Sequence, residues 1–199
     1  MVFNISLEAY VSVILSLFII KSGLELIKES VDNILGVRIK SDLSKKIKED
    51  IQKEADVQGA FDLVLNNYSP DKYWGSIHIE VADTLSVADV DKISRKITKC
   101  VMEKYGIVLH TIGIYSVNTK DKNIIKIKND IHAIVFSHTG ILQMHGFYVD
   151  GADKTISFDI IIDFNIKNRE KLYKELYDEI QDKFKDYKII LTLDVDISD

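Results

Sequence analysis

The chain opens with a long apolar stretch and then changes to short apolar runs that are separated by charged residues. No charged residue occurs between Ala9 and Ile20, and apolar residues at helical spacing continue the stretch to Leu35. This pattern predicts one helix over Leu7–Leu35 that ends at Gly36. At about 1.5 Å per residue the helix is about 43 Å long, which is enough to span a bilayer.

Basic residues follow the predicted helix, at Arg38, Lys40, Lys45, Lys46 and Lys48. An excess of Lys and Arg after an apolar helix marks the cytoplasmic side of a membrane. We therefore expect the rest of the chain to lie in the cytoplasm. A buried core helix and an interfacial helix stay open as alternatives, whereas the uncharged start and the missing cleavage site disfavour a signal peptide.

The remainder of the chain alternates helical and strand patterns. The predicted elements are a helix from Ser41 to about Lys53, strands at Gly59–Asn66 and Tyr73–Val81 with a turn at Ser69, Pro70 and Asp71, a helix from Ser86, and a strand at about Val108–Val117. Their order is αββαβ.

The second half of the chain repeats this order. A shift of 81 residues places Gly59–Ile114 over Gly140–Val195 without a gap, and it aligns hydrophobic positions and element lengths. We predict an internal duplication in which the first helix of the second copy lies near Ile125–Ser137. The fold class is then α+β: a transmembrane-type helix in residues 1–37, one αββαβ unit in 38–119 and another in 120–199.

Each unit is expected to leave one face of its sheet open, because both helices cover the other face. Strict alternation places Phe61 and Leu63 on the core face, and Asp62 and His78 on the open face. If the hairpin turns about Pro70, Asp62 lies opposite His78, within reach of a shared ion.

The composition narrows the function classes. Hydrophobic residues make up 46% and charged residues 29% of the chain, as in folded proteins. The net charge of −5 argues against nucleic acid as a partner. Cys100 is the one cysteine, which excludes an internal disulfide, and phosphate-loop and nucleophile motifs are absent. We therefore expect neither an enzyme nor an organic cofactor.

Several segments resemble the cation diffusion facilitator family, also called cation efflux proteins. They are SVDNILG, VQGAFDLVLNNYSPDKYWGSIHIEV, LSVADVDKISRKI and IGIYSVNT, within about Leu7 to Thr119. The second copy resembles the extended tail of some members. The resemblance implies the last membrane helix and the cytoplasmic, ferredoxin-like domain of a homodimeric exporter in the cell membrane.

The family exports zinc, iron, manganese and similar divalent cations, usually against protons, through six membrane helices. The resemblance therefore implies dimerisation and metal-dependent regulation as the role of this part. Because no residues correspond to the first five helices, we do not expect this chain to transport alone.

The resemblance further implies a regulatory metal site on the open sheet face. His78 and Asp62 match ligand positions of the family, and Asp91 stands where other members have a helix histidine. Phe61 and Tyr115 depart from the pattern, because they stand where other members have ligands.

The second copy adds further acidic candidates. By the 81-residue shift, Asp159 takes the place of His78 and Asp196 takes the place of Tyr115. The candidate ligands for zinc, iron or manganese are thus His78, Asp62, Asp91, Asp159 and Asp196. His145, Asp163 and Asp194 are also in this copy, and alternation leaves open which way His145 faces.

Two other functions stay open at this point. A membrane-tethered dimerisation module without metal would explain the departures from the family's ligand pattern, with His78 and Asp62 in a plain hydrogen bond. A soluble enzyme of the ferredoxin-like class would require Leu7–Leu35 to pack inside the fold.

Overall fold

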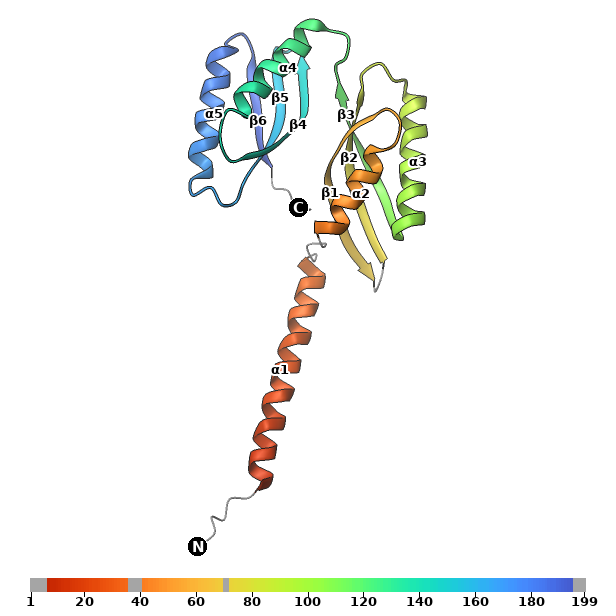
Figure 1. Ribbon diagram of the computed structural model, residues 1–199, viewed down its shortest axis with the longest axis vertical. Coiled ribbons are helices and arrows are strands. Elements are labelled where there is room, and N and C mark those ends of the chain that lie inside the picture. The colour runs from red at the N-terminus through yellow and green to blue at the C-terminus, as the bar shows by residue number, and fades with distance from the viewer. Residues whose placement is uncertain (1–6, 36–40, 70–71, 195–199) are drawn as a thin grey trace. The chain divides into compact units, whose positions relative to one another are not determined.

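The computed structural model describes residues 7–35, 41–69 and 72–194. The long helix α1 (Leu7–Leu35) comes first, and two successive parts of the order αββαβ follow it, as Figure 1 shows. The chain divides into two compact units, residues 1–37 and 38–199. The fold is therefore the α+β arrangement that the sequence predicts, with two ferredoxin-like parts in the second unit.

Helix α1 has the predicted bounds. Its segment Glu8–Lys28 has a mean hydropathy of 1.8 and is long and apolar enough to cross a membrane. Large apolar side chains along it are exposed, for example Ile14 at 67% and Phe18 at 66%. Helix α1 thus meets the length and composition requirements of a membrane span. The predicted stop at Gly36 and the basic residues Arg38 and Lys40 lie outside the described residues.

The first αββαβ part forms a three-stranded sheet in the order β1-β2-β3. Strand β2 pairs antiparallel with β1 and parallel with β3. Its elements are α2 (Ser41–Gln52), β1 (Val57–Ser69), β2 (Lys72–Ala82), α3 (Val87–Tyr105) and β3 (Ile107–Val117). The predicted turn includes residues 70 and 71, which lie outside the described part.

The two helices of this part cover one face of the sheet. Ile47 from α2 and Ile97 from α3 are fully buried, together with Ile77 and Ile79 of the central strand β2. A capping box starts α3, because Ser86 accepts a hydrogen bond from the backbone N–H of Asp89 while the Asp89 carboxylate accepts one from the Ser86 N–H.

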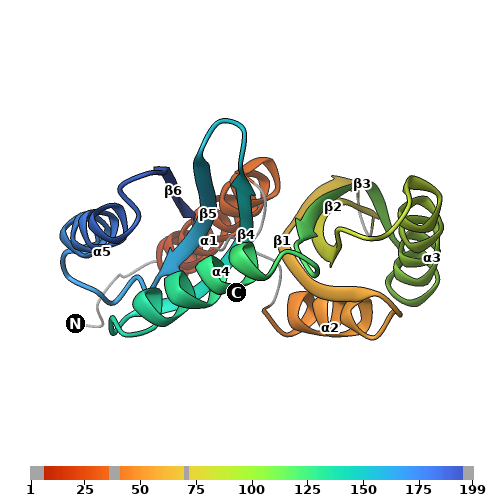
Figure 2. The ribbon, with the colours of Figure 1, turned by 90° about the horizontal axis from the view of Figure 1, so that it is seen from above.

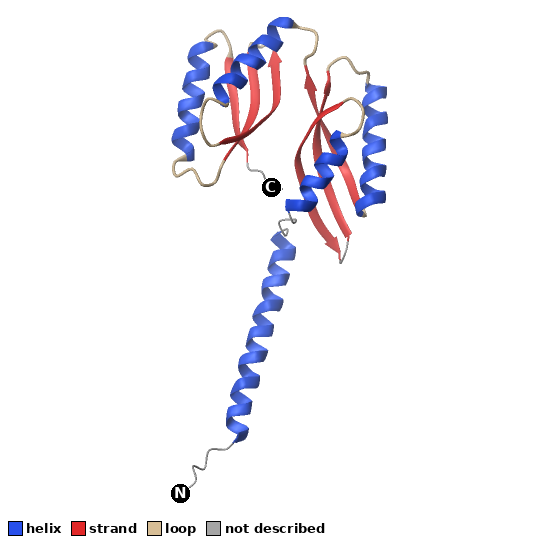
Figure 3. Ribbon diagram, viewed as in Figure 1, coloured by secondary structure: helices blue, strands red, loops and turns tan. Residues whose placement is uncertain are grey.

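The second part repeats this architecture in the order β4-β5-β6, as the blue helices and red strands of Figure 3 show. Its core contains Ile131, Phe158, Ile160 and Leu176. Its elements are α4 (Lys122–Val135), β4 (Ile141–Asp150), β5 (Thr155–Ile162), α5 (Arg169–Lys183) and β6 (Lys188–Asp194).

The duplication is visible in the strand register, but the constant shift of 81 residues is wrong. The pair Phe61 and His78 in the first sheet corresponds to His145 and Asp159 in the second, so β4 is offset by 84 residues and β5 by 81. The last strand is offset by 79, because His78 pairs with Gly113 whereas Asp159 pairs with Thr192. Two connections are shorter in the second copy, and a gapless alignment cannot follow them.

The first strand of each part carries a β-bulge at the same point. The register shifts between Phe61 and Val64, where Asp62 has φ 55°, and between His145 and Tyr148, where Gly146 has φ 64°. A bulge places two successive residues opposite one partner and breaks the alternation of the strand. The prediction that Phe61 faces the core was therefore wrong: Phe61 pairs with His78 and stacks on His145 of the other sheet.

The open faces of the two sheets are turned toward each other within residues 38–199. Figure 2 shows α3 and α5 at the outer ends of this pair, with the two sheets between them. The phenol of Tyr115 on β3 reaches across to Asp159 on β5, at 3.5 Å. The second sheet thus covers the face that strand alternation leaves open in the first.

Candidate metal centre

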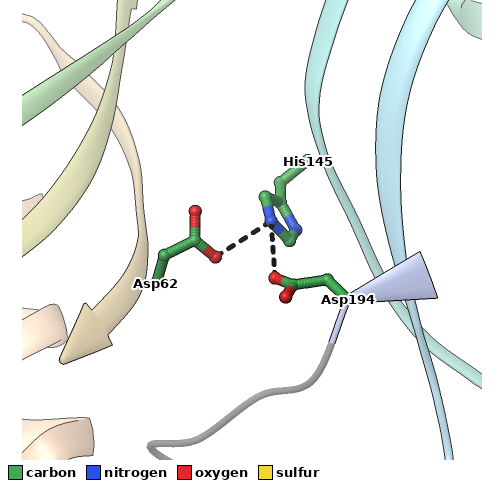
Figure 4. Close-up of side chains that lie close together, drawn as sticks. All are labelled: Asp62, His145 and Asp194. Carbon is green, nitrogen blue, oxygen red and sulfur yellow. Dashed lines mark ion pairs between the residues drawn. The ribbon is translucent and has the colours of Figure 1, made fainter. Parts of the chain in front are cut away.

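Three side chains from the two sheets converge between the facing surfaces, as Figure 4 shows: Asp62, His145 and Asp194. Asp62 is the bulged residue of β1, and His145 directly precedes the bulged Gly146 of β4. Asp194 is the last residue of β6. Each bulge turns a side chain of a first strand toward the opposite sheet, which is how one imidazole comes to lie between two carboxylates.

The distances between the donor atoms are short. Nε2 of His145 lies 3.0 Å from Oδ1 of Asp62 and 3.5 Å from Oδ2 of Asp194. The three ligand atoms all lie within 4.8 Å of one another. Oδ2 of Asp159 lies 4.0 Å from the same nitrogen, so a further carboxylate borders the cluster.

Two of the three separations in the cluster are compatible with a single divalent cation. Ligand atoms about 2.1 Å from one ion are separated by about 3.0 Å in octahedral geometry and about 3.4 Å in tetrahedral geometry. The two imidazole–carboxylate distances match these separations. Imidazole nitrogen combined with carboxylate oxygen is a donor set that suits zinc, ferrous iron and manganese.

His145 is the least exposed member of the cluster. Its side chain is 0% exposed, whereas those of Asp62 and Asp194 are 19% and 35% exposed. Among the described residues, neither ring nitrogen of His145 has a hydrogen bond of good geometry. A buried polar group without a well-formed hydrogen bond is costly, and Nε2 of His145 is held here by its ion pair with Asp62 at 3.0 Å.

The charges in the cluster shift the protonation of its members. Burial disfavours the ionised form of Asp62, but the close contact with His145 and the hydrogen bond from Tyr115 outweigh it and lower the pKa of Asp62. Burial likewise disfavours the imidazolium of His145, but Asp62, Asp159 and Asp194 outweigh it and raise the pKa of His145 above 6.5. The cluster therefore concentrates negative charge around one imidazole.

Aromatic rings enclose the cluster. The Phe61 ring stacks on His145 with 5.1 Å between centroids and 9° between planes, and Tyr115 stacks on His78 at 4.7 Å and 19°. The Tyr115 hydroxyl donates a hydrogen bond to Oδ2 of Asp62 at 3.0 Å. Burial and the charge of Asp62 raise the pKa of Tyr115, so the phenol stays protonated and orients the carboxylate.

The residues predicted from the sequence fall into three groups. Asp62 and His78 lie together, with Oδ2 of Asp62 2.9 Å from Nδ1 of His78, and Asp159 borders the cluster. Asp91 is an exposed residue of α3 that pairs with Arg95 at 2.7 Å on the helical side of the sheet, so the structure does not bring it to the cluster. Asp196 lies outside the described residues. The role of all five as metal ligands stays a prediction.

Two members of the cluster were not among those five candidates. Strict alternation could not orient His145, because the Gly146 bulge follows it directly. The proposed equivalence of Asp196 with Tyr115 was wrong: Tyr115 pairs with Glu80, and Asp194 pairs with the corresponding Ile161. A gapped comparison of the copies would have placed Asp194, not Asp196, at this position.

The fold and the cluster together define a ferredoxin-like domain with a candidate divalent-cation site on its open face. Residues 39–113 match the family described as cation efflux protein, cytoplasmic domain. The resemblance seen in the sequence is thereby confirmed for residues 39–113, which are similar to that cytoplasmic domain. The match indicates a transporter-associated module rather than a catalyst. No curated protein matches the chain.

Proposed function

We propose that this protein serves in a divalent cation efflux transporter as the cytoplasmic part that mediates dimerisation and metal-dependent regulation. The observation that carries the proposal is the buried imidazole of His145 between the carboxylates of Asp62 and Asp194, at 3.0 and 3.5 Å. The family match of residues 39–113 supports the same assignment. Transport against protons belongs to the complete family architecture.

The cation that we propose for this site is zinc, ferrous iron or manganese. Asp62, His145 and Asp194 would hold it, with Asp159 next to them and His78 beside the outer oxygen of Asp62. One nitrogen and several oxygen donors favour these ions over softer ones that need sulfur. Asp91 is a weaker candidate because of its ion pair with Arg95.

The proposed regulatory effect follows from the fact that the candidate ligands come from both sheets. Asp62 belongs to the first sheet, whereas His145 and Asp194 belong to the second. A cation that binds all three links the sheets, so it favours the state in which they lie close together. A ligand shifts such an equilibrium only through its unequal affinity for the two states.

The proposed organisation has three parts: a membrane helix in residues 1–37, a cytoplasmic dimerisation domain in 38–119 and a second ferredoxin-like domain in 120–199. The apolar segment Glu8–Lys28 supports the first part, and the two separate hydrophobic cores support the others. We place the helix in the cell membrane, with the two domains in the cytoplasm and the transporter as a homodimer.

Titration of the full chain in mild detergent tests the proposal. Chelator-treated protein is titrated with zinc, manganese and ferrous iron in a calorimeter, and bound metal is counted by elemental analysis. We expect saturable binding by the wild type and at least a tenfold weaker affinity for Asp62→Asn, because the substitution removes a charged ligand. Asparagine also tolerates the positive φ of this position, so the backbone is preserved.

Glu103→Gln is the matched control, since it removes an exposed carboxylate that pairs with Lys99 and is not among the candidate ligands. It should bind like the wild type. If a folded wild-type chain binds none of the three ions, the metal-dependent function is wrong.

In that case the metal-free dimerisation module is the better account. The contacts that favour this second function are those that a protonated His145 makes with Asp62 and Asp194, together with the Tyr115 hydrogen bond. They offset part of the negative charge without a cation.

A further inference from the structure

We infer that the second ferredoxin-like part is a built-in partner of the first, so that the two form a heterotypic pair within one chain and complete one cation site per chain. The cation part of this inference rests on the proposed function, whereas the pairing does not. Contacts between two copies of the chain then use surfaces other than the open sheet faces.

The contacts between the two sheet faces are related by an approximate two-fold symmetry, as in a symmetric dimer. Phe61 and His145 occupy equivalent positions and stack on each other. Asp62 of the first part lies near Asp194 of the second. Their equivalents in the other part are Gly146 and Tyr115. These two also lie close together, because a Cβ at Gly146 would be 3.2 Å from the Tyr115 ring. The pair therefore resembles a homodimer whose two halves are joined in one chain.

The two halves differ at the positions that form the cluster. A second copy of the first part would place Phe61 and Tyr115 where His145 and Asp194 lie, and both second-sheet ligands would be lost. A second copy of the second part would place Gly146 where Asp62 lies. Only the unlike pair brings an imidazole between two carboxylates.

The connection between the parts favours pairing within one chain. Residues 118–121 join β3 to α4, and four extended residues reach about 14 Å. Both ends of this connection are anchored: Thr119 donates hydrogen bonds to Asp83 at 2.9 and 3.1 Å, and Asp121 caps α4. A short linker gives the attached partner an effective concentration in the millimolar range, which a second chain does not reach at ordinary expression levels.

Photo-cross-linking of the full chain tests the pairing without metal. The photoreactive residue p-benzoylphenylalanine is placed at Tyr115, whose ring faces Gly146. We expect cross-links to peptides of β4 in the band of monomer mass on a denaturing gel. The same residue at Val87, which is 87% exposed at the start of α3, is the control and should give no cross-link to β4. Cross-links to β4 in a band of dimer mass, or none to β4, would overturn the inference.

Complementation tests whether one chain completes the site. Full chains with Asp62→Asn and with Asp194→Asn are co-expressed, purified in detergent and titrated with the ion that the wild type binds. If sites form within chains, neither variant has a complete set and the mixture binds no better than each variant alone. If sites form between chains, one of the two pairings contains all three ligands and restores part of the binding, which would contradict the inference.

The two failures are distinguishable. A wild-type chain that binds no ion refutes the proposed function, and the cross-linking result still decides the pairing. A wild-type chain that binds ions but is cross-linked between chains refutes the pairing alone.

Discussion

Asp62 has φ 55° and Gly146 has φ 64°, and both residues sit at the same point of the first strand of their sheet. At each bulge the residue before it also faces the opposite sheet, as the stacking of Phe61 on His145 shows. The bulge residue is an aspartate in the first part and a glycine in the second, because the space around the two positions differs. A Cβ at Gly146 would lie 3.1 Å from Oδ2 of Asp159 and 3.2 Å from the Tyr115 ring.

Gly146→Ala should therefore lower the free energy of unfolding by about 1–2 kcal/mol, because an alanine is strained in the left-handed region and its methyl group crowds Tyr115. Urea denaturation of the full chain, followed by circular dichroism, measures the change. Gly151→Ala is the control, since a Cβ there meets nothing within 4 Å, and it should change the free energy by less than about 0.5 kcal/mol. Equal effects of the two substitutions would show that the bulge is not constrained.

At the scale of elements, an ionic cluster joins the two helices of the first part. Asp50 on α2 accepts hydrogen bonds from Lys53 at 2.8 Å, from Lys104 at 3.2 Å and from the Tyr105 hydroxyl at 2.8 Å. These three donors, Lys53 first, hold the pKa of Asp50 well below its ordinary value of 3.8. Burial and the neighbouring carboxylate raise the pKa of Tyr105 to about 12.

The sign of the resulting pH dependence follows from the lowered pKa of Asp50. The ionised carboxylate stabilises the folded state above its unfolded pKa of about 4, and this contribution is lost as the pH falls toward the lower folded value. Asp50→Asn should thus lower the melting temperature at neutral pH, and the difference from the wild type should shrink below about pH 4.

Differential scanning fluorimetry of the full chain from about pH 7 to about pH 3 measures this effect. Glu49→Gln changes the neighbouring exposed position and should have a smaller effect at every pH. A difference between Asp50→Asn and the wild type that stays constant over this range would contradict the role of the ionised Asp50.

At the scale of the whole molecule, α1 stands apart from the other described helices, because its segment Glu8–Lys28 is long and apolar enough to cross a membrane. In the described part of α1 the large apolar side chains, such as Ile14 and Phe18, remain exposed. Exposed apolar surface of this extent is stable in lipid and unfavourable in water.

The substitutions Leu17→Arg and Phe18→Arg together place two charges near the middle of the apolar segment Glu8–Lys28. Each charge costs about 2.5–3.5 kcal/mol at the centre of a membrane helix, so the double variant should move from the membrane pellet to the soluble fraction. Fractionation of cells after an alkaline wash measures the distribution. Leu17→Ile with Phe18→Leu is the matched control and should stay in the pellet; a pellet that retains both variants alike would argue against a span.

The order of the helices and strands was predictable, because each element depends on the local pattern of apolar and polar residues. The bounds of α1 agree with the prediction, and α3 begins at the predicted Ser86 cap. The equivalent core residues Ile97 and Leu176 lie on helices whose apolar spacing is visible in the sequence. The length of the hairpin connection, which changes the offset between the copies, leaves no such periodic signal.

The candidate site was only half predictable. Asp62 and His78 could be placed on one face because they lie on neighbouring strands of one hairpin, and their contact of 2.9 Å agrees with that placement. His145 and Asp194 could not be placed in this way. The bulge after His145 breaks the alternation of its strand, and the offset between the two copies changes by two residues before Asp194.

The sequence by itself determined the apolar helix, the two αββαβ parts and the kinship of residues 39–113 with the cation efflux cytoplasmic domain. These properties depend on local periodicity and on residues close together in the chain. Only the tertiary structure decided what covers the open sheet faces, and so which side chains meet there. Asp62 and His145 are 83 positions apart, and their approach to 3.0 Å requires two bulges and the docking of one sheet on the other.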